Sequence, residues 1–208
     1  MNPTIGLRLI FAVTITLTGV GHAMAIEEAS YNVVVKDEKF EVRDYSTHVL
    51  AETIVDGDLE KAGSKAFDRL FRYISGDNQS RNKVAMTAPV SQERAREKIK
   101  MTAPVSQQRV QEKWAVSFMM PATYTLETLP VPSNPAVTLR QVPARRMATV
   151  RYSGLWGEAR YLEHKTALES WMRAKGLTAS GAPVWARYNP PFTPWFMRRN
   201  EILIPVAP

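Results

Sequence analysis

Hydrophobic and polar positions follow two different periods along this chain, and the periods recur twice in the same order. Residues 40–57 and residues 137–154 have equal length, and each segment reads as two short strands joined by a turn and ending at a glycine. Aligned without gaps, the two segments share three residues, at Arg43 and Arg140, Ala51 and Ala148, and Gly57 and Gly154. This correspondence indicates an internal duplication.

A predicted amphipathic helix follows each pair of strands. After Asp58, a natural N-cap, apolar residues recur at three- and four-residue spacing as far as Ile74, and Gly76 marks the stop. The second helix is expected at residues 156–175, before Gly176. Two more strands follow each helix: the M-T-A-P-V region and residues 114–119 in the first half, and residues 184–188 and 201–204 in the second.

The order of these elements defines the predicted fold class. It is an α+β fold in which a pseudo-twofold duplicated ββαββ unit forms a distorted antiparallel β-barrel with two flanking helices. The proline-rich residues 129–135 and 189–194 are expected to be loops, because proline lacks the N–H that a sheet ladder needs.

The string M-T-A-P-V-S-Q occurs twice, at residues 86–92 and 101–107, with a charged stretch between the copies. Each copy is expected to be a short strand that ends at its proline. Two equal strands would place Met86 and Met101 on comparable faces. Methionine fills irregular apolar sites, so plain packing and the lining of a ligand site both stay open.

Residues 1–25 have the pattern of a secretory signal. Arg8 precedes an apolar run at residues 9–20, which is shorter than the roughly 20 residues that a membrane-spanning helix needs, and Ala23-Met24-Ala25 is a cleavage site. We expect cleavage after Ala25 and export, to the periplasm. An uncleaved membrane anchor is the alternative. Residues 26–208 are then expected to form a single domain.

The net charge and the cysteine content limit the classes of partner that the chain could bind. The chain has a net charge of +7, which becomes +6 when the signal and its one basic residue are removed. A basic surface favours nucleic acid, anionic lipid or a ligand with carboxylates. Export argues against nucleic acid, whereas peripheral membrane contact stays open and a monomer is expected. The chain has no cysteine, which excludes disulfides and thiolate metal sites.

The ordered motifs together resemble the SOUL family of haem-binding proteins over nearly the whole of residues 26–208. The motifs that carry this resemblance are F-E-V-R-D-Y at residues 40–45, R-Y-I-S-G at 72–76, the two M-T-A-P-V strings, W-A-V-S-F-M-M-P at 114–121, P-P-F-T-P at 190–194 and R-R-N-E at 198–201.

The resemblance implies that haem or a related tetrapyrrole binds non-covalently in an apolar groove beside the first helix. Phe67 and Phe71 fall at apolar groove positions, and Arg72 falls where a basic helix residue serves the propionates in the animal type. Thr193 stands where that type has a loop lysine. Asp44 stands where one branch has a histidine proposed as an axial ligand.

Other side chains are candidates by their chemistry. Arg198 and Arg199 are suited to pair with propionates, although solvated charges at a turn are an equally ordinary role. His48 and His164 are weak axial-ligand candidates, each weighed against an ordinary structural role. Burial of a flat apolar ring is favourable without any axial bond, at roughly 25 cal/mol per Å².

The leading hypothesis is therefore a non-catalytic tetrapyrrole-binding protein that carries, buffers or sequesters its ligand. Two alternatives remain. The first is binding of another apolar or amphiphilic effector, because the doubled layout resembles effector-binding domains of some bacterial regulators. The second is an enzyme that acts on a tetrapyrrole. The chain lacks the G-x-S-x-G, H-E-x-x-H, P-loop and Rossmann motifs.

Overall fold

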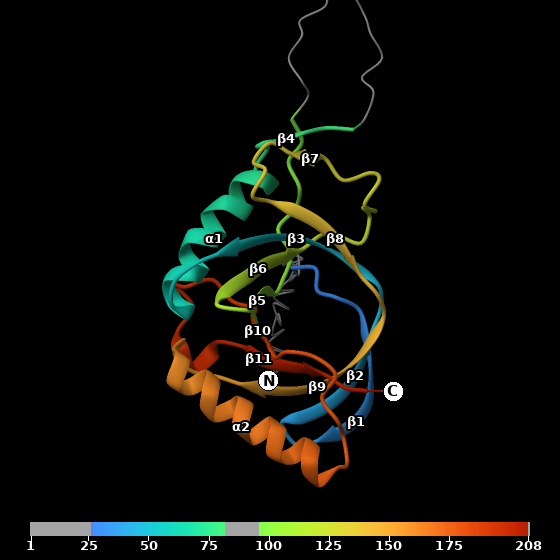
Figure 1. Ribbon diagram of the computed structural model, residues 1–208, viewed down its shortest axis with the longest axis vertical. Helices are drawn as coiled ribbons and strands as arrows, with labels where there is room; N and C mark the ends of the chain where they lie inside the picture. The colour runs from blue at the N-terminus through green and yellow to red at the C-terminus, as the bar shows by residue number, and fades with distance from the viewer. Residues whose placement is uncertain (1–25, 82–95, 208) are drawn as a thin grey trace, which may run out of the picture.

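A computed structural model describes residues 26–81 and 96–207. Within these residues two helices cover a long antiparallel sheet that curls into an incomplete barrel (Figure 1). The elements are β1 Tyr31–Asp37, β2 Phe40–Tyr45, β3 His48–Val55, α1 Leu59–Ile74, β4 Asn78–Gln79, β5 Val105–Val110, β6 Lys113–Met119, β7 Val131–Pro132, β8 Thr138–Val142, β9 Arg145–Tyr152, α2 Glu158–Ala174, β10 Val184–Arg187, the 3-10 helix η1 Trp195–Met197 and β11 Asn200–Pro205. The predicted α+β distorted barrel is confirmed.

The strand order shows how the two repeats combine. The large sheet runs β1-β2-β9-β11-β10-β5-β6-β3-β8, and each neighbouring pair is antiparallel. The first strand of each repeat pairs with the second strand of the other, since β2 lies beside β9 and β8 lies beside β3. The repeats therefore exchange strands, and neither repeat completes its sheet alone.

Both helices pack on the same face of the sheet and bury one continuous core. α1 lies against β3 and β6, and α2 lies in the corresponding place against β9 and β11. Leu70, Trp185 and Ile202 are among the fully buried side chains of this core. Because strand side chains alternate between faces, the residues on either side of Trp185 and of Ile202 point away from the helices. We call the face of the sheet away from the helices the inner face.

The helix boundaries confirm the sequence reading. Asp58 caps α1 by accepting a hydrogen bond from the Lys61 N–H at 2.8 Å. Beyond α1, Gly76 has φ +115°, and beyond α2, Gly176 has φ +69°. Glycine adopts such positive φ angles without steric cost, so both helices end where the glycines predicted.

The expected strand in the second M-T-A-P-V copy is wrong. Residues 99–102 lie outside any strand, and β5 begins at Val105, after the proline instead of before it. Thr102 and Ala103 are both buried while Met101 is exposed, so the predicted alternation fails. The polar groups are used elsewhere: the Thr102 hydroxyl donates to the Met119 carbonyl and the Ala103 N–H donates to Glu27. The first copy, with Met86, lies outside the described residues.

Three strands lie outside the predicted set. β1 is an edge strand whose central five residues are all exposed, and β4 and β7 form a two-residue pair that includes part of the expected loop 129–135. Ahead of β1, residues 26–30 cross the inner face as an extended segment that we call the N-terminal strap. It is held by hydrogen bonds from the Ala103 N–H to the Glu27 carbonyl and from the Ser46 N–H to the Ser30 carbonyl.

Candidate ligand-binding groove

The loop before β11 presents apolar side chains to solvent. Arg198 fixes this loop by donating to the carbonyl oxygens of Thr193 at 2.8 Å and Pro191 at 2.6 Å. While Arg198 is bound in this way, four large apolar side chains of the loop point to solvent and are between 57% and 87% exposed: Phe192, Trp195, Phe196 and Met197. Leu155 is also exposed, and the neighbouring Gly154 N–H donates to the Trp195 carbonyl. A cluster of exposed apolar residues of this size is typical of an interaction site.

One face of α1 carries a second set of apolar side chains. Gly63, Phe67 and Phe71 are spaced four residues apart, so they lie in line on the helix. Gly63 is buried, Phe67 is partly buried against Phe118, and Phe71 is 46% exposed. The rings of Phe67 and Phe71 stack with centroids 5.8 Å apart. The helix therefore offers an aromatic stripe that rises out of the core.

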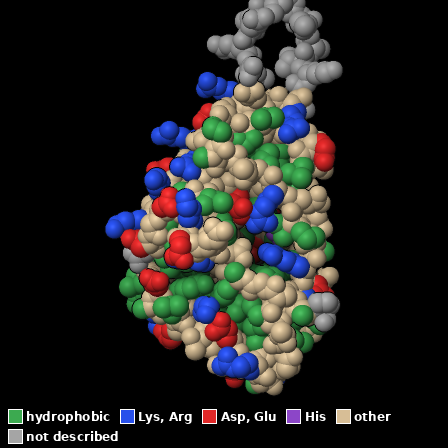
Figure 2. All heavy atoms as spheres, viewed as in Figure 1, with side chains coloured by type: hydrophobic (Ala, Val, Ile, Leu, Met, Phe, Trp, Pro, Cys, Tyr) green, Lys and Arg blue, Asp and Glu red, His purple; other side chains and the backbone are tan. Residues whose placement is uncertain are grey.

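A tryptophan and two arginines connect the helix to the loop. Trp156, just before α2, has the Arg198 guanidinium 4.5 Å and the Arg187 guanidinium 5.0 Å from its ring centroid. Arg187 also contacts α1, because its Nη2 lies 2.7 Å from the point where a Cβ at Gly63 would stand. We call the surface formed by the exposed face of α1, Trp156 and the loop 189–198 the groove. Hydrophobic side chains gather at the left margin of Figure 2, at the height where both helices begin in Figure 1.

The other basic residues predicted for propionates lie apart from this junction. Arg72 is exposed near the C-terminal end of α1, where it lines a surface hollow of about 460 Å³ with Asp77, Arg96 and Lys98. Lys and Arg side chains project along this α1 edge in Figure 2. Thr193 is partly buried in the loop, where its carbonyl holds Arg198. The structure thus brings Phe67, Thr193 and Arg198 to the groove and leaves Arg72 at its far end.

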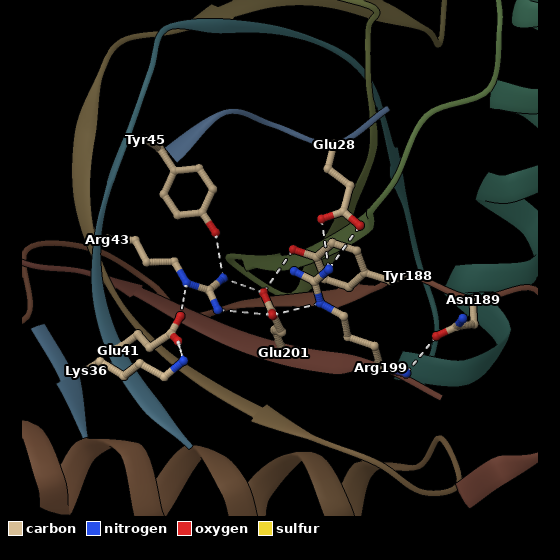
Figure 3. Close-up of polar contacts among 9 residues, drawn as sticks. All are labelled: Glu28, Lys36, Glu41, Arg43, Tyr45, Tyr188, Asn189, Arg199 and Glu201. Carbon is tan, nitrogen blue, oxygen red and sulfur yellow. Dashed lines mark hydrogen bonds and ion pairs between the residues drawn. The ribbon is translucent and has the colours of Figure 1, made fainter. Parts of the chain in front are cut away.

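Arg199 belongs to a buried ion-pair network on the inner face (Figure 3). Its guanidinium donates to Glu28 of the strap at 2.8 Å and to Glu201 at 3.0 Å. Glu201 also accepts hydrogen bonds from Arg43 at 2.8 Å and from the Tyr188 hydroxyl at 2.9 Å. The guanidinium predicted to meet a propionate is therefore occupied by two carboxylates, and it ties the strap to the second half of the sheet.

The pKa values within this network follow from burial and pairing together. Burial alone would raise the pKa of Glu201, but the hydrogen bonds and charges of Arg43 and Arg199 hold it below its ordinary value. Burial alone would lower the pKa of Arg43, but Glu201 raises it instead. Burial raises the pKa of Tyr45, the hydroxyl of which accepts from Arg43, to about 12. All of these groups keep their ordinary charge at neutral pH.

The two histidines lie on opposite faces of the sheet. His48 lines an inner-face cavity of about 70 Å³ together with Arg140 and Arg145, and its Nδ1 lies 2.9 Å from the Ser46 carbonyl. His164 lies on the buried face of α2, where its ring stacks on the Tyr152 ring with the centroids 3.9 Å apart. Burial lowers the pKa of both rings. The structure does not bring them together, and Met101 lies exposed outside the groove contacts described above.

The sequence analysis missed several groove residues. Trp156, Trp195 and Arg187 belong to it, and Leu155 lies at its edge. A signal was present for Arg187: it stands two residues after Trp185, so both side chains lie on the same face of β10. A charged residue at a core-facing strand position is unusual, and that departure marks a functional candidate.

The fold and the groove define a class of protein: a doubled ββαββ half-barrel with an apolar, arginine-bordered surface at the start of its helices. Within that class the chain belongs to the SOUL heme-binding protein family, the sequence model of which matches residues 26–205. Among the described residues no helix is long and apolar enough to span a membrane, and no three His, Cys, Asp or Glu side chains gather as a metal site.

Curated relatives agree with this placement, and structural neighbours share the fold. Heme-binding protein 1 of Xenopus tropicalis is 26% identical over 182 residues, covering 85% of this chain and 90% of that protein. Heme-binding protein 1 of Mus musculus is 26% identical over 150 residues, covering 72% of this chain and 74% of that protein. Two solved structures share the fold. A hydrolase from Listeria innocua is 12% identical with a TM-score of 0.54, and the match covers 84% of this chain and 94% of that one. The EcmrR C-terminal domain is 13% identical with a TM-score of 0.54, and the match covers 85% of this chain and 98% of that one.

Proposed function

We propose that this protein binds haem or a closely related tetrapyrrole non-covalently in the groove and releases it unchanged. Family membership and the names of the two relatives support the ligand class. One observation supports the location: the exposed apolar side chains on the loop 189–198 are linked through Arg198, Trp156 and Arg187 to Gly63, where the aromatic stripe of α1 begins. A flat apolar ring laid there removes both surfaces from water.

The residues of the groove fit such a ligand without an axial bond to iron. The apolar ring meets Phe71 and Trp195, and the carboxylates meet the basic groups at the groove border. Neither histidine belongs to the groove, since His48 faces the inner cavity and His164 lies on the buried face of α2. Binding through the ring faces and the acidic groups accommodates haem and the metal-free porphyrin alike. This suits a monomeric carrier, buffer or sequestering protein.

Titration with haemin tests the proposal. The chain beginning at Ile26 should give a saturable Soret change and quenching of tryptophan fluorescence, because Trp195 and Trp156 lie in the groove. Metal-free protoporphyrin should bind with similar affinity. The haemin spectrum should then stay constant for hours, whereas its replacement by a free-base spectrum would indicate an enzyme. Absence of binding, with a thermal shift from other amphiphiles, would indicate a different effector.

We propose in addition that the protein is exported after cleavage behind Ala25. The strap supports this boundary, because the hydrogen bonds of Glu27 and Glu28 all remain in a chain that starts at Ile26. Mass spectrometry of the protein from a cell-envelope fraction should give a mass that corresponds to residues 26–208. A full-length mass in the membrane fraction would instead indicate an uncleaved anchor.

A further inference from the structure

Arg187 lies where α1, α2 and the loop 189–198 meet, and its surroundings are aromatic. It ends β10, a central strand with β5 on one side and β11 on the other. Its guanidinium lies 5.0 Å from the ring centroids of both Trp156 and Trp185. Cation–π contacts of this kind stabilise a guanidinium, but they leave its N–H donors without an acceptor.

Arg187 also differs from the paired arginines in the described parts of the chain. Arg43 and Arg199 share Glu201, and Arg140 is held by both oxygens of Glu52. Arg187 has no carboxylate partner and no hydrogen-bond acceptor among residues 26–81 and 96–207. Burial accordingly lowers its pKa to about 10. Within the described part of the chain, none of its nitrogens is among the fully buried atoms without a partner, so the guanidinium is reachable by water and by an incoming anion.

The space around Arg187 is kept open by a glycine. The point where a Cβ at Gly63 would stand lies 2.7 Å from Arg187 Nη2 and 3.4 Å from Gln107 Oε1. That oxygen is buried and has no partner among the described residues, while Gln107 Nε2 donates to the Leu59 carbonyl. Glycine inside a helix costs roughly 1 kcal/mol relative to alanine. Its presence in α1 makes room for the guanidinium.

The aromatic stripe of α1 begins at this point. Gly63, Phe67 and Phe71 follow one face of α1 over about 12 Å, at 1.5 Å per residue. On the other side, the Trp156 ring makes cation–π contacts with both Arg187 and Arg198. Arg198 in turn donates to the loop that exposes Trp195. A ligand whose carboxylate reached Arg187 would therefore have its ring between the face of α1 and the loop.

We propose that Arg187 is the counter-cation for a carboxylate of the bound ligand, and that the ligand is a flat apolar ring with at least one acidic side chain. This inference rests on the proposed function. It adds a specificity determinant: the groove selects the carboxylic acid form of the ring over forms that lack the acid. The arginine forms a charge-assisted hydrogen bond with the carboxylate, and ligand burial strengthens that bond.

The test compares protoporphyrin IX with its dimethyl ester, which has the same ring and no carboxylate. Dissociation constants are measured by tryptophan quenching for the wild type, Arg187→Gln, Arg187→Lys and Gly63→Ala. Arg109→Gln is the matched control, because Arg109 lies 5.3 Å from the Trp114 ring but pairs with Glu112 at 3.0 Å. The unfolding midpoint of each variant is recorded alongside.

The wild type and Arg109→Gln should bind the acid about tenfold or more tightly than the ester. Arg187→Gln should lose most of this preference through weaker binding of the acid, with ester binding unchanged. Arg187→Lys should retain part of it, because the charge remains but the planar fork is lost. Gly63→Ala should lower it by displacing the guanidinium. Arg187→Lys and Gly63→Ala give the answer if Arg187→Gln does not fold.

Two further outcomes separate this inference from the proposed function. If the wild type binds both forms and Arg187→Gln keeps the wild-type preference, or weakens acid and ester equally, Arg187 is not the counter-cation. If the wild type binds neither form, the proposed function itself is wrong, and the inference fails with it.

Discussion

Glu201 is a fully buried carboxylate, and its partners show how much one charge contributes to this fold. Arg43, Arg199 and Tyr188 all donate to it, and Arg43 is itself almost completely buried. Replacing the shared carboxylate leaves Arg43 with Glu41 and Arg199 with Glu28 as the remaining ion-pair partners, so the buried positive charge is only partly compensated. Glu201→Gln should therefore lower the free energy of unfolding by about 3–5 kcal/mol, measured by urea denaturation. A loss below about 1 kcal/mol would show that the network adds little.

The same network gives the protein an acid-sensitive stability. The pKa of Glu201 is lower in the folded chain than its ordinary value of 4.5, so the folded state favours the ionised form. The stabilisation from this group is complete above pH 4.5 and is lost as pH falls through the folded pKa. Urea midpoints measured between pH 7 and pH 3 should fall for the wild type, and they should fall less for Glu201→Gln. Parallel curves for the two proteins would contradict this assignment.

Phe67 and Phe71 separate stability from binding on one helix. Phe67 packs on Phe118 with ring centroids 5.3 Å apart, whereas Phe71 is nearly half exposed. Phe67→Ala should lower the free energy of unfolding by about 2 kcal/mol or more, and Phe71→Ala should change it by less than about 0.5 kcal/mol. Chemical denaturation measures both. Equal losses would mean that Phe71 is a core residue.

At the scale of elements, the N-terminal strap joins the two halves of the sheet. Its Ala29 packs on Leu50 and Met119 of the first half and on Met147 and Leu203 of the second. Glu28 adds the ion pair with Arg199. A chain starting at Tyr31 should thus be less stable than one starting at Ile26, by about 1–3 kcal/mol, because three hydrogen bonds from backbone N–H groups to the strap are lost together with the Glu28–Arg199 ion pair. Equal thermal midpoints would mean that the strap is dispensable.

Elements that bury one face were predictable from the sequence. Elements without a buried face were not predictable. β2, β3 and α1 follow the period of a strand or a helix, because most of their side chains between the sheet and the helices are apolar. β1 carries three successive exposed valines at an edge, so it has no alternation to detect. The M-T-A-P-V copy alternates in sequence, yet its hydrogen bonds go to the strap and to β6, which no local pattern reveals.

At the scale of the whole molecule, the duplication was predictable from the sequence, whereas the exchange of strands between the repeats was not. Matching residues 40–57 to 137–154 predicts two equal units, but which strands pair is settled by contacts more than a hundred residues apart, such as Phe40 with Val150. The groove was predictable only in part for the same reason. Phe67 is found from its helix, whereas the exposure of Trp195 and the surroundings of Arg187 among the described residues depend on the assembled fold.

The proposed ligand site is the groove between α1 and the loop 189–198. The most direct measurement is a haemin titration of the wild type, Phe71→Ala and the control Leu162→Ala, which removes a comparably exposed apolar side chain (48%) from α2. Phe71→Ala should weaken binding by about fivefold or more, corresponding to about 1 kcal/mol of lost apolar burial, and Leu162→Ala should match the wild type. Equal affinity of all three proteins, or a loss only in Leu162→Ala, would contradict the claim.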